Sequence, residues 1–501
     1  MKRYIFIIFL LLIFHGLKSQ SIATSLLYQF KTFCVKGVIR NYVPNDENRF
    51  VTFRTYEITG LDKDTSIIVD KQGRFNCELV QSFEGDIGMI YRDHYINMYA
   101  IPSDTIGLEI DEHIWSIQEN KANAIKFSGN SAQVSRMINE FRSLYVSHQF
   151  VNHADIGDTS QPDKVFATKR IQQLNEELDL LNSYLSANKI TEYKYTQWAK
   201  NHLIYSAGVD IVSFPFYGKR NRQMTFKTLI DLLGPIKLEN NTVMTSSNYY
   251  GMLYYLSGHF EIIANLNPEY QPEIDKVGKS RMLFILNQLD HFATGKAKEF
   301  MYFDVYIQNF KRQINDCEAN ISRFESVIIQ QDLKTLFQKI RTSKKEYFEP
   351  FSVLKRISEY PLTNSISSVF ARIITENPGK YLFIDFWGSW CAPCMNEMPL
   401  YPKLIENLKE QPVVFIFFAV QTDEQKIQET KDKYHIDGQF ISLNDNDTRM
   451  LNNILQFSSY PAHFLIDPNG MLVNNALDRL DSGGGLNGQV AYQIKQTILN
   501  R

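Results

Sequence analysis

Two cysteines separated by two residues follow directly after an apolar run, and this arrangement constrains the fold more than any other feature. The apolar run, residues 381–386, predicts a buried strand. The stretch from Met395 to Lys409 predicts a helix. Cys391-Ala-Pro-Cys394 therefore stands at a strand-to-helix junction, where the free N–H groups and the dipole of the helix stabilise a thiolate. The second cysteine, one turn later, can attack a mixed disulfide and release the product.

A CxxC pair is also half of a structural zinc site, which needs a second pair or histidines at ligand spacing. The other cysteines, Cys34, Cys77 and Cys317, are isolated from one another and from any close histidine. The preceding Trp387-Gly-Ser-Trp390 indicates a surface turn and not a buried, inert pair. A redox dithiol is therefore preferred to a zinc site. We expect no metal and no cofactor, because both electrons travel on the two sulfurs.

Length and composition indicate a folded protein of several domains. The 501 residues exceed the size at which one hydrophobic core keeps growing. Hydrophobic residues make up 44% and charged residues 22% of the chain, as in folded proteins and unlike disordered ones. The formal net charge of −2 gives no electrostatic reason to expect nucleic acid as a partner.

The N-terminus has the pattern of a secretory signal. Lys2 and Arg3 precede an apolar run at residues 4–14, which is too short to span a bilayer. We expect residues 1–19 to be a signal peptide that is cleaved after Ser19. An uncleaved membrane anchor is the alternative, because the sequence lacks a clean A-x-A cleavage pattern. Export would place the dithiol in an oxidising compartment.

Residues 30–128 predict a small antiparallel β-sandwich, since short β-prone runs alternate there with turn signals. Asp70-Lys-Gln-Gly73 lies between two such runs and indicates a hairpin. Cys77 falls on the apolar face of its run, so we expect a buried free thiol. A Cys34–Cys77 disulfide is the alternative in an exported protein.

The hydrophobic periodicity of the sequence changes twice in the rest of the chain. Residues 129–348 have helical periodicity and predict a mainly α-helical region. Residues 349–501 alternate strands and helices, which predicts a parallel βαβ unit followed by an antiparallel hairpin around Asp467-Pro-Asn-Gly470. The expected strands there are 381–386, 413–420, 440–443, 462–467 and 471–473, and the expected helices are 391–409, 423–433, 448–456 and 489–499.

Several motifs of residues 349–501 occur together in one known family. They are Phe386-Trp-Gly-Ser-Trp-Cys-Ala-Pro-Cys394, then Glu397 and Pro399, then Tyr460-Pro461 and Asp467-Pro-Asn-Gly470. With them this part resembles thioredoxin, in particular the TlpA/ResA-like exported thiol–disulfide oxidoreductases. The β and helical regions resemble, more loosely, the accessory N-terminal parts of large members from Gram-negative bacteria. The resemblance implies a multidomain periplasmic protein whose C-terminal domain has the α/β thioredoxin fold.

The resemblance also assigns roles to four residues near the dithiol. Cys391 is expected to be the exposed, attacking thiolate, and Cys394 the more buried, resolving thiol. Asp385 stands at the position of the buried carboxylate of thioredoxin and would exchange a proton with Cys394. Its alternative is a strand-end cap or a solvent contact. Glu397 resembles the active-site glutamate of the family, and its alternative is an ordinary surface charge in a first helical turn.

Three further residues are expected to bind substrate. Pro461 matches the cis-proline that faces the CxxC motif in this fold. Its missing N–H leaves the backbone of Tyr460 able to pair with an extended substrate segment. Trp390 would form an apolar rim around the sulfurs, whereas Trp387 is expected to pack in the core.

The residues between the cysteines bear on the direction of the reaction. Ala392-Pro393 supplies no histidine to stabilise the thiolate, so the couple is expected to favour a reductant. The expected partners are oxidised exported proteins as substrates and a membrane thiol electron donor. A thiol oxidase or isomerase with the same residues is one alternative. The other is a scaffold that binds partners through its β and helical regions.

Overall fold

The computed structural model describes most of the chain in a series of ranges. They are residues 31–45, 49–56, 62–81, 83–92, 94–117, 121–147, 161–216, 223–239, 246–310, 314–342, 350–359, 366–455, 457, 460–475, 477, 479–480 and 487–499. The predicted signal peptide, residues 1–19, lies outside them. The chain divides into two compact units, the first ending at Phe337 and the second beginning at Gln338, with Lys63–Ser66 grouped with the second. This division is coarser than the predicted boundaries at residues 128 and 348, which stay predictions.

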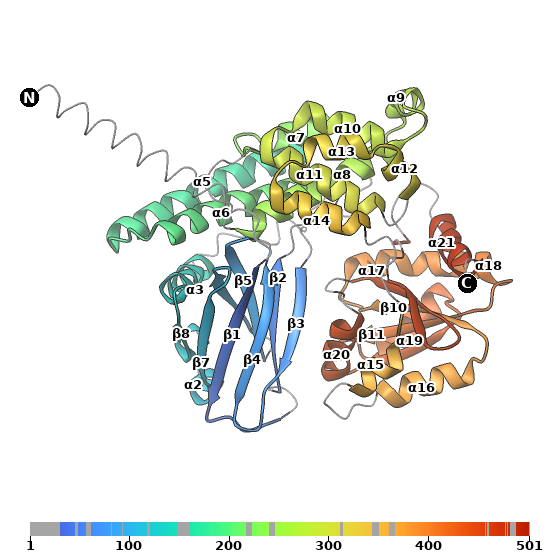
Figure 1. Ribbon diagram of the computed structural model, residues 1–501, viewed down its shortest axis with the longest axis horizontal. Helices are drawn as coiled ribbons and strands as arrows, with labels where there is room; N and C mark the ends of the chain where they lie inside the picture. The colour runs from blue at the N-terminus through green and yellow to red at the C-terminus, as the bar shows by residue number, and fades with distance from the viewer. Residues whose placement is uncertain are drawn as a thin grey trace, which may run out of the picture. The chain divides into compact units, whose positions relative to one another are not determined.

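The β-rich part of the first unit contains two four-stranded sheets, in the orders β4-β1-β7-β8 and β3-β2-β5-β6 (Figure 1). The strands are β1 (Lys31–Arg40), β2 (Phe50–Tyr56), β3 (Asp62–Ile68), β4 (Arg74–Gln81), β5 (Gly85–Tyr91), β6 (His94–Ala100), β7 (Thr105–Asp111) and β8 (Ile125–Ser128). Side chains of both sheets, such as Val35 and Met89, share one hydrophobic core. The expectation of purely antiparallel strands is wrong, because β1 and β7 run parallel. The sandwich arrangement stays a prediction.

The turn at Asp70 to Gly73 forms, but it does not close the predicted hairpin. The N–H of Gly73 donates to the carbonyl of Asp70 at 2.9 Å. The strands on either side, β3 and β4, belong to different sheets. The turn therefore carries the chain from one sheet to the other, which the local turn signal does not reveal.

The register of β1 and β4 explains why Cys34 and Cys77 are both free thiols. Cys34 lies opposite Glu78, and Cys77 lies opposite Val35. Successive residues of a strand point to opposite faces of a sheet, so the two thiols point away from each other. Cys77 is buried in the core, as expected, and the alternative Cys34–Cys77 disulfide is wrong.

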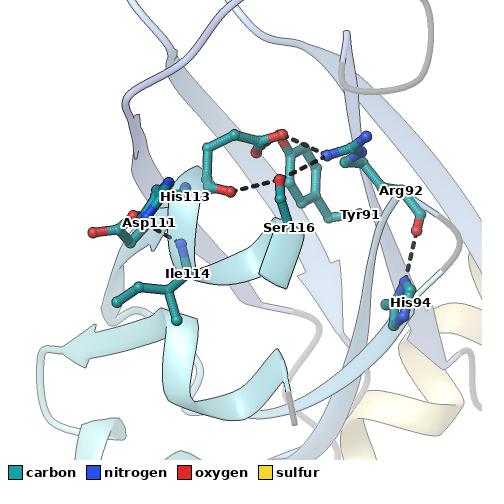
Figure 2. A network of polar contacts seen from close by, with 8 residues as sticks. Tyr91, Arg92, His94, Asp111, His113, Ile114 and Ser116 are labelled. Carbon is teal, nitrogen blue, oxygen red and sulfur yellow. Dashed lines mark hydrogen bonds and ion pairs between the residues drawn. The ribbon is translucent and has the colours of Figure 1, made fainter. Parts of the chain in front are cut away.

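The short helix α2 (Glu112–Ile117) contacts the end of β5, where Arg92 lies beside Ser116 (Figure 2). Glu112 is 9% exposed. It accepts hydrogen bonds from the hydroxyl of Tyr91 and, at 2.8 Å, from Nη1 of Arg92. Both donors come from the end of β5, so the contact holds α2 to this strand end.

The helical part of the first unit follows the predicted periodicity. Its helices are α3 (Ala132–Ser147), α5 (Asp163–Ala187), α6 (Tyr193–Ser213), α7 (Phe226–Leu232), α8 (Ser247–Leu266), α9 (Gln271–Lys276), α10 (Arg281–Phe292), α11 (Gly295–Phe310), α12 (Ile314–Ala319) and α13 (Ile321–Val327). The helix α14 (Gln331–Thr342) crosses into the second unit at residue 338. Among the helices in the ranges given above, none has the length and hydrophobicity needed to cross a membrane.

The carboxylate of Asp86 joins β5 to the start of α8. Its Oδ1 accepts from the backbone N–H of Ser247 at 2.8 Å, and its Oδ2 accepts from the hydroxyl of Ser247 at 2.9 Å. Asp86 is 3% exposed. Burial raises the pKa of Asp86 to about 6, although the hydrogen bonds from Ser247 oppose the shift.

The second unit is built on a six-stranded sheet in the order β12-β11-β10-β13-β14-β9. Its strands are β9 (Phe351–Ser352), β10 (Tyr381–Trp387), β11 (Val413–Val420), β12 (Gln439–Leu443), β13 (Ala462–Ile466) and β14 (Met471–Asn474). The strands β10, β11 and β12 are parallel, and β13 pairs antiparallel with both β10 and β14. The predicted βαβ unit and final hairpin are thus confirmed.

Helices cover both faces of this sheet and bury two separate cores (Figure 1). The helices are α15 (Val353–Glu359), α16 (Ile366–Glu376), α17 (Ala392–Glu397), α18 (Tyr401–Leu408), α19 (Glu424–Tyr434), α20 (Asp445–Leu455) and α21 (Asn487–Leu499). The cysteine-side core contains the CxxC pair with residues of α18, α19 and α21, and the opposite core contains residues of α15, α16 and α20. The single helix expected over 391–409 is wrong: a 3₁₀ turn, Met398–Leu400, separates α17 from α18. Pro399 and Pro402 cannot donate the hydrogen bonds of a continuous helix.

We expect the burial of Asp86 to produce a pH-dependent stability. A carboxyl group whose pKa is higher in the folded than in the unfolded chain stabilises the fold below the unfolded value and loses this contribution as the pH rises through the folded value. The Asp86→Asn variant has no carboxyl group to ionise at this position. Between about pH 4 and pH 7, its unfolding free energy should therefore fall by about 2 to 3 kcal/mol less than that of the wild-type protein. Urea denaturation at both pH values measures the difference. Asp231→Asn, an exposed position on α7, is the control, and an Asp86→Asn protein with wild-type pH dependence would contradict the prediction.

Candidate functional site

The two cysteines form a disulfide at the start of α17. Cys391 and Cys394 are joined with an S–S distance of 2.02 Å. Cys391 is the N-cap of the helix, and its Sγ accepts from the backbone N–H of Cys394 at 3.2 Å. Pro393 stands in the first turn, where a missing N–H removes no helical hydrogen bond. The strand–CxxC–helix junction predicted from the sequence is confirmed.

The exposure of the two sulfur residues differs from the expectation in one respect. Cys391 is 5% exposed and Cys394 is fully buried. Cys394 is thus the more buried residue, but the expectation that Cys391 is exposed is wrong. Cys391 belongs to the cysteine-side core, against which Met395 and Tyr460 also pack.

The expected substrate-binding residues lie at the start of β13. The bond between Tyr460 and Pro461 is cis, as the sequence resemblance implies. Trp390 is 52% exposed, and its ring meets that of Tyr460 edge to face, with 5.5 Å between the centroids. Its Nε1 donates to the carbonyl of Val420 at 3.0 Å. A Cβ on Gly388 would lie 2.5 Å from that nitrogen, so glycine permits the indole to lie there. The substrate-binding roles themselves stay predictions.

Asp385 and a histidine that the sequence analysis missed lie directly opposite each other in the sheet. Asp385 on β10 pairs with His463 on β13. Directly opposite residues point to the same face, and Phe383 and Leu465, two residues away on each strand, lie in the cysteine-side core. Asp385 is 1% exposed, so the alternative of a solvent contact is wrong. Nε2 of His463 lies 3.4 Å from Oδ1 of Asp385.

Glu397, the last residue of α17, contacts the same histidine. It is fully buried, so its alternative as a surface charge is wrong. Its Oε2 lies 3.1 Å from Nε2 of His463. Its Oε1 accepts from the backbone N–H of Leu480 at 3.1 Å and from Nε of Arg479 at 3.3 Å. The hydroxyl of Tyr401 lies 3.2 Å from the same imidazole nitrogen. We call Asp385, Glu397, Tyr401 and His463 the buried polar cluster.

The charges of this cluster shift two pKa values. Burial alone would lower the pKa of His463, but the charge of Glu397 and the hydrogen bonds and charge of Asp385 outweigh it, so that the pKa lies well above its usual value. Burial, and then the same two charges, raise the pKa of Tyr401 well above its usual value.

The sequence holds a weak signal for His463 and almost none for its partners. His463 is a lone histidine in the apolar strand Ala462–Ile466, and it has the same phase as Leu465. Its meaning depends on the pairing with β10, which is a tertiary feature. Tyr401 and Arg479 have no local pattern that distinguishes them from core and surface residues.

Comparison with known proteins supports a thioredoxin-like domain in the second unit. Residues 379–472 match the family model described as Thioredoxin-like. Proteins named thiol-disulfide oxidoreductase ResA from Bacillus cereus and Bacillus subtilis are 33% and 32% identical to this chain over 99 and 100 residues. These matches cover 20% of this chain and 56% and 54% of those proteins, about half of their length.

Solved structures give a match of similar extent. The thioredoxin domain of a thiol-disulfide oxidoreductase from Bacteroides vulgatus is 17% identical, with a TM-score of 0.21. The match covers 24% of this chain and 81% of that one. The family model thus establishes a thioredoxin-like domain within the second unit. Within the part of the chain that the structure describes, no group of three or more His, Cys, Asp or Glu side chains is placed to hold a metal ion.

We expect the removal of Glu397 to destabilise the fold strongly. Glu397→Ala leaves the imidazolium of His463 and the N–H of Leu480 without this partner, and breaking a buried ion pair costs about 3 kcal/mol or more. Glu406→Ala is the control, because Glu406 is 66% exposed and pairs with Lys409 on the surface of α18; its cost should stay below about 1 kcal/mol. Urea denaturation of the oxidised proteins measures both, and equal costs would contradict the prediction.

Proposed function

We propose that this chain, whose second unit contains a thioredoxin-like domain, is an exported thiol–disulfide oxidoreductase of the periplasm that reduces disulfides of other exported proteins. The single observation that carries the proposal is the disulfide between Cys391 and Cys394 at the N-terminus of α17. The similarity of residues 379–472 to thioredoxin-like proteins supports the reaction type. The signal-like pattern of residues 1–19 supports export.

The two sulfurs carry both electrons of the reaction. In the reduced protein, the Cys391 thiolate attacks a substrate disulfide, so that one substrate thiolate leaves and a mixed disulfide forms. Cys394 then loses its proton and attacks Cys391 Sγ. The S–S bond to the substrate breaks, the second substrate thiolate leaves, and the Cys391–Cys394 disulfide forms. Two electrons have then passed from the protein to the substrate. A membrane thiol electron donor would restore the dithiol.

The environment of the sulfurs supports a protein segment as the substrate. Trp390 offers an exposed aromatic ring, which contacts the partly buried ring of Tyr460 at the core that holds the disulfide. Pro461 has no N–H and therefore donates no backbone hydrogen bond. The backbone of Tyr460, directly before it, can pair with an extended substrate chain. The Ala392-Pro393 spacer supports the reducing direction, because no histidine stabilises the thiolate. For residues 30–128, the common core of the two sheets supports a sandwich as the accessory domain.

The proposal predicts that single-cysteine variants separate the two chemical steps. Cys394→Ser should retain a mixed disulfide between Cys391 and substrate, because no second thiol resolves it. Cys391→Ser should form none and should lose catalysed disulfide reduction down to the uncatalysed rate. Non-reducing electrophoresis and mass spectrometry of the reduced full chain with a disulfide-bonded protein measure both results.

Cys317→Ser is the matched control. Cys317 is fully buried in α12, and burial raises the pKa of its thiol to about 12, so it should not exchange. Wild-type turnover by Cys391→Ser would contradict the proposal and favour a scaffold role. Rapid oxidation of reduced substrates by the disulfide form, without reduction of oxidised ones, would favour an oxidase.

A further inference from the structure

His463 is the basic residue at the centre of the buried polar cluster. Its side chain is 1% exposed, and Nε2 alone lies within 3.1 to 3.4 Å of three oxygens. These oxygens belong to Asp385 from β10, Glu397 from α17 and Tyr401 from α18. The thiol–disulfide reaction written above assigns His463 no part.

The carboxylates around His463 indicate a role for its imidazole. Two carboxylates buried within reach of one nitrogen repel each other, and a positive charge between them offsets this repulsion. Arg479, whose side chain is 44% exposed, compensates Glu397 from the other side and approaches its Oε1. Nε2 of His463 faces the remaining oxygens, Glu397 Oε2 at 3.1 Å and Asp385 Oδ1 at 3.4 Å. With His463 charged, both carboxylates can remain ionised.

The resolving sulfur needs a base from the protein. Cys394 is fully buried, so water does not reach its thiol directly in this conformation. Glu397 follows Cys394 by three residues and therefore lies on the same face of α17. Tyr401 belongs to the same packed core as Cys394. The buried polar cluster and the Cys394 thiol thus belong to the same side of the sheet.

We propose that His463 is a positioning residue of the dithiol: its positive charge keeps Asp385 and Glu397 ionised, so that a carboxylate can accept the Cys394 proton. The inference rests on the proposed function and names a residue that sets its second step. In that step the Cys394 S–H bond breaks, the proton passes to a carboxylate, and the sulfur attacks Cys391 Sγ. The bond between Cys391 and the substrate sulfur breaks, and the substrate leaves as a thiolate.

The test follows this step by itself. The Cys391 thiol is converted to a mixed disulfide with thionitrobenzoate, and the release of the coloured thiolate by Cys394 is recorded from about pH 5 to pH 9. We expect His463→Gln, which keeps an N–H donor but loses the charge, to slow release at neutral pH about tenfold or more. Its rate should recover at high pH, so the midpoint of the pH profile should move up by at least one unit. His435→Gln, at an exposed histidine of the same unit, is the control.

The outcomes separate this inference from the proposed function. Release by His463→Gln with the wild-type pH profile overturns the role of His463 and leaves the proposed function intact. A wild-type mixed disulfide that releases no thiolate overturns both.

A measurement on the unaltered protein does not depend on the folding of the variant. The chain has ten histidines, and at pH 8 an ordinary histidine is neutral. The ¹⁵N spectrum of the oxidised wild-type protein should retain one imidazolium signal at this pH. The absence of any such signal overturns the inference.

Discussion

The antiparallel pairing of β10 with β13 is the contact on which the dithiol site depends. It joins two segments that lie about eighty residues apart, with Phe386 opposite Ala462 at the end of β10. The CxxC turn follows β10, and the cis Tyr460–Pro461 bond precedes β13. Both therefore lie at the same end of this pair of strands. The next pair in the same register is Asp385 and His463, one residue further into the sheet from that end. One register thus positions the sulfurs, the cis-proline and the buried charges together.

The buried polar cluster shows how charge is accommodated in an otherwise apolar core. Asp385, Glu397 and His463 are almost or fully inaccessible to solvent. Buried ions are expensive unless they are paired, and replacing such a group by apolar residues is often neutral or stabilising. Stability therefore does not by itself account for the cluster. The proposed transfer of the Cys394 proton to a carboxylate gives the cluster a role apart from stability.

Local patterns in the sequence were sufficient to predict most elements of the second unit. The strand Val413–Val420 has the predicted bounds, because a continuous apolar run suits a strand buried on both faces. The helix after the dithiol was predicted as one element, although Pro399 and Pro402 divide it. Features that depend on tertiary pairing were missed, namely the partners of β3 and β4, the low exposure of Cys391 and the ionic role of His463. Turn chemistry and hydrophobic period do not specify which strands become neighbours.

The proposed reducing role depends on the potential of the Cys391–Cys394 couple. The most direct test is to equilibrate the full chain in dithiol–disulfide buffers of graded potential and to map the oxidised cysteines by mass spectrometry. The account predicts that Cys391 and Cys394 interconvert as a pair, with a reduction potential below about −200 mV. It also predicts that Cys77 and Cys317, both buried, stay reduced throughout. A potential near that of a strong oxidant, above about −150 mV, would contradict the reducing direction, and a pair that does not interconvert would contradict the account as a whole.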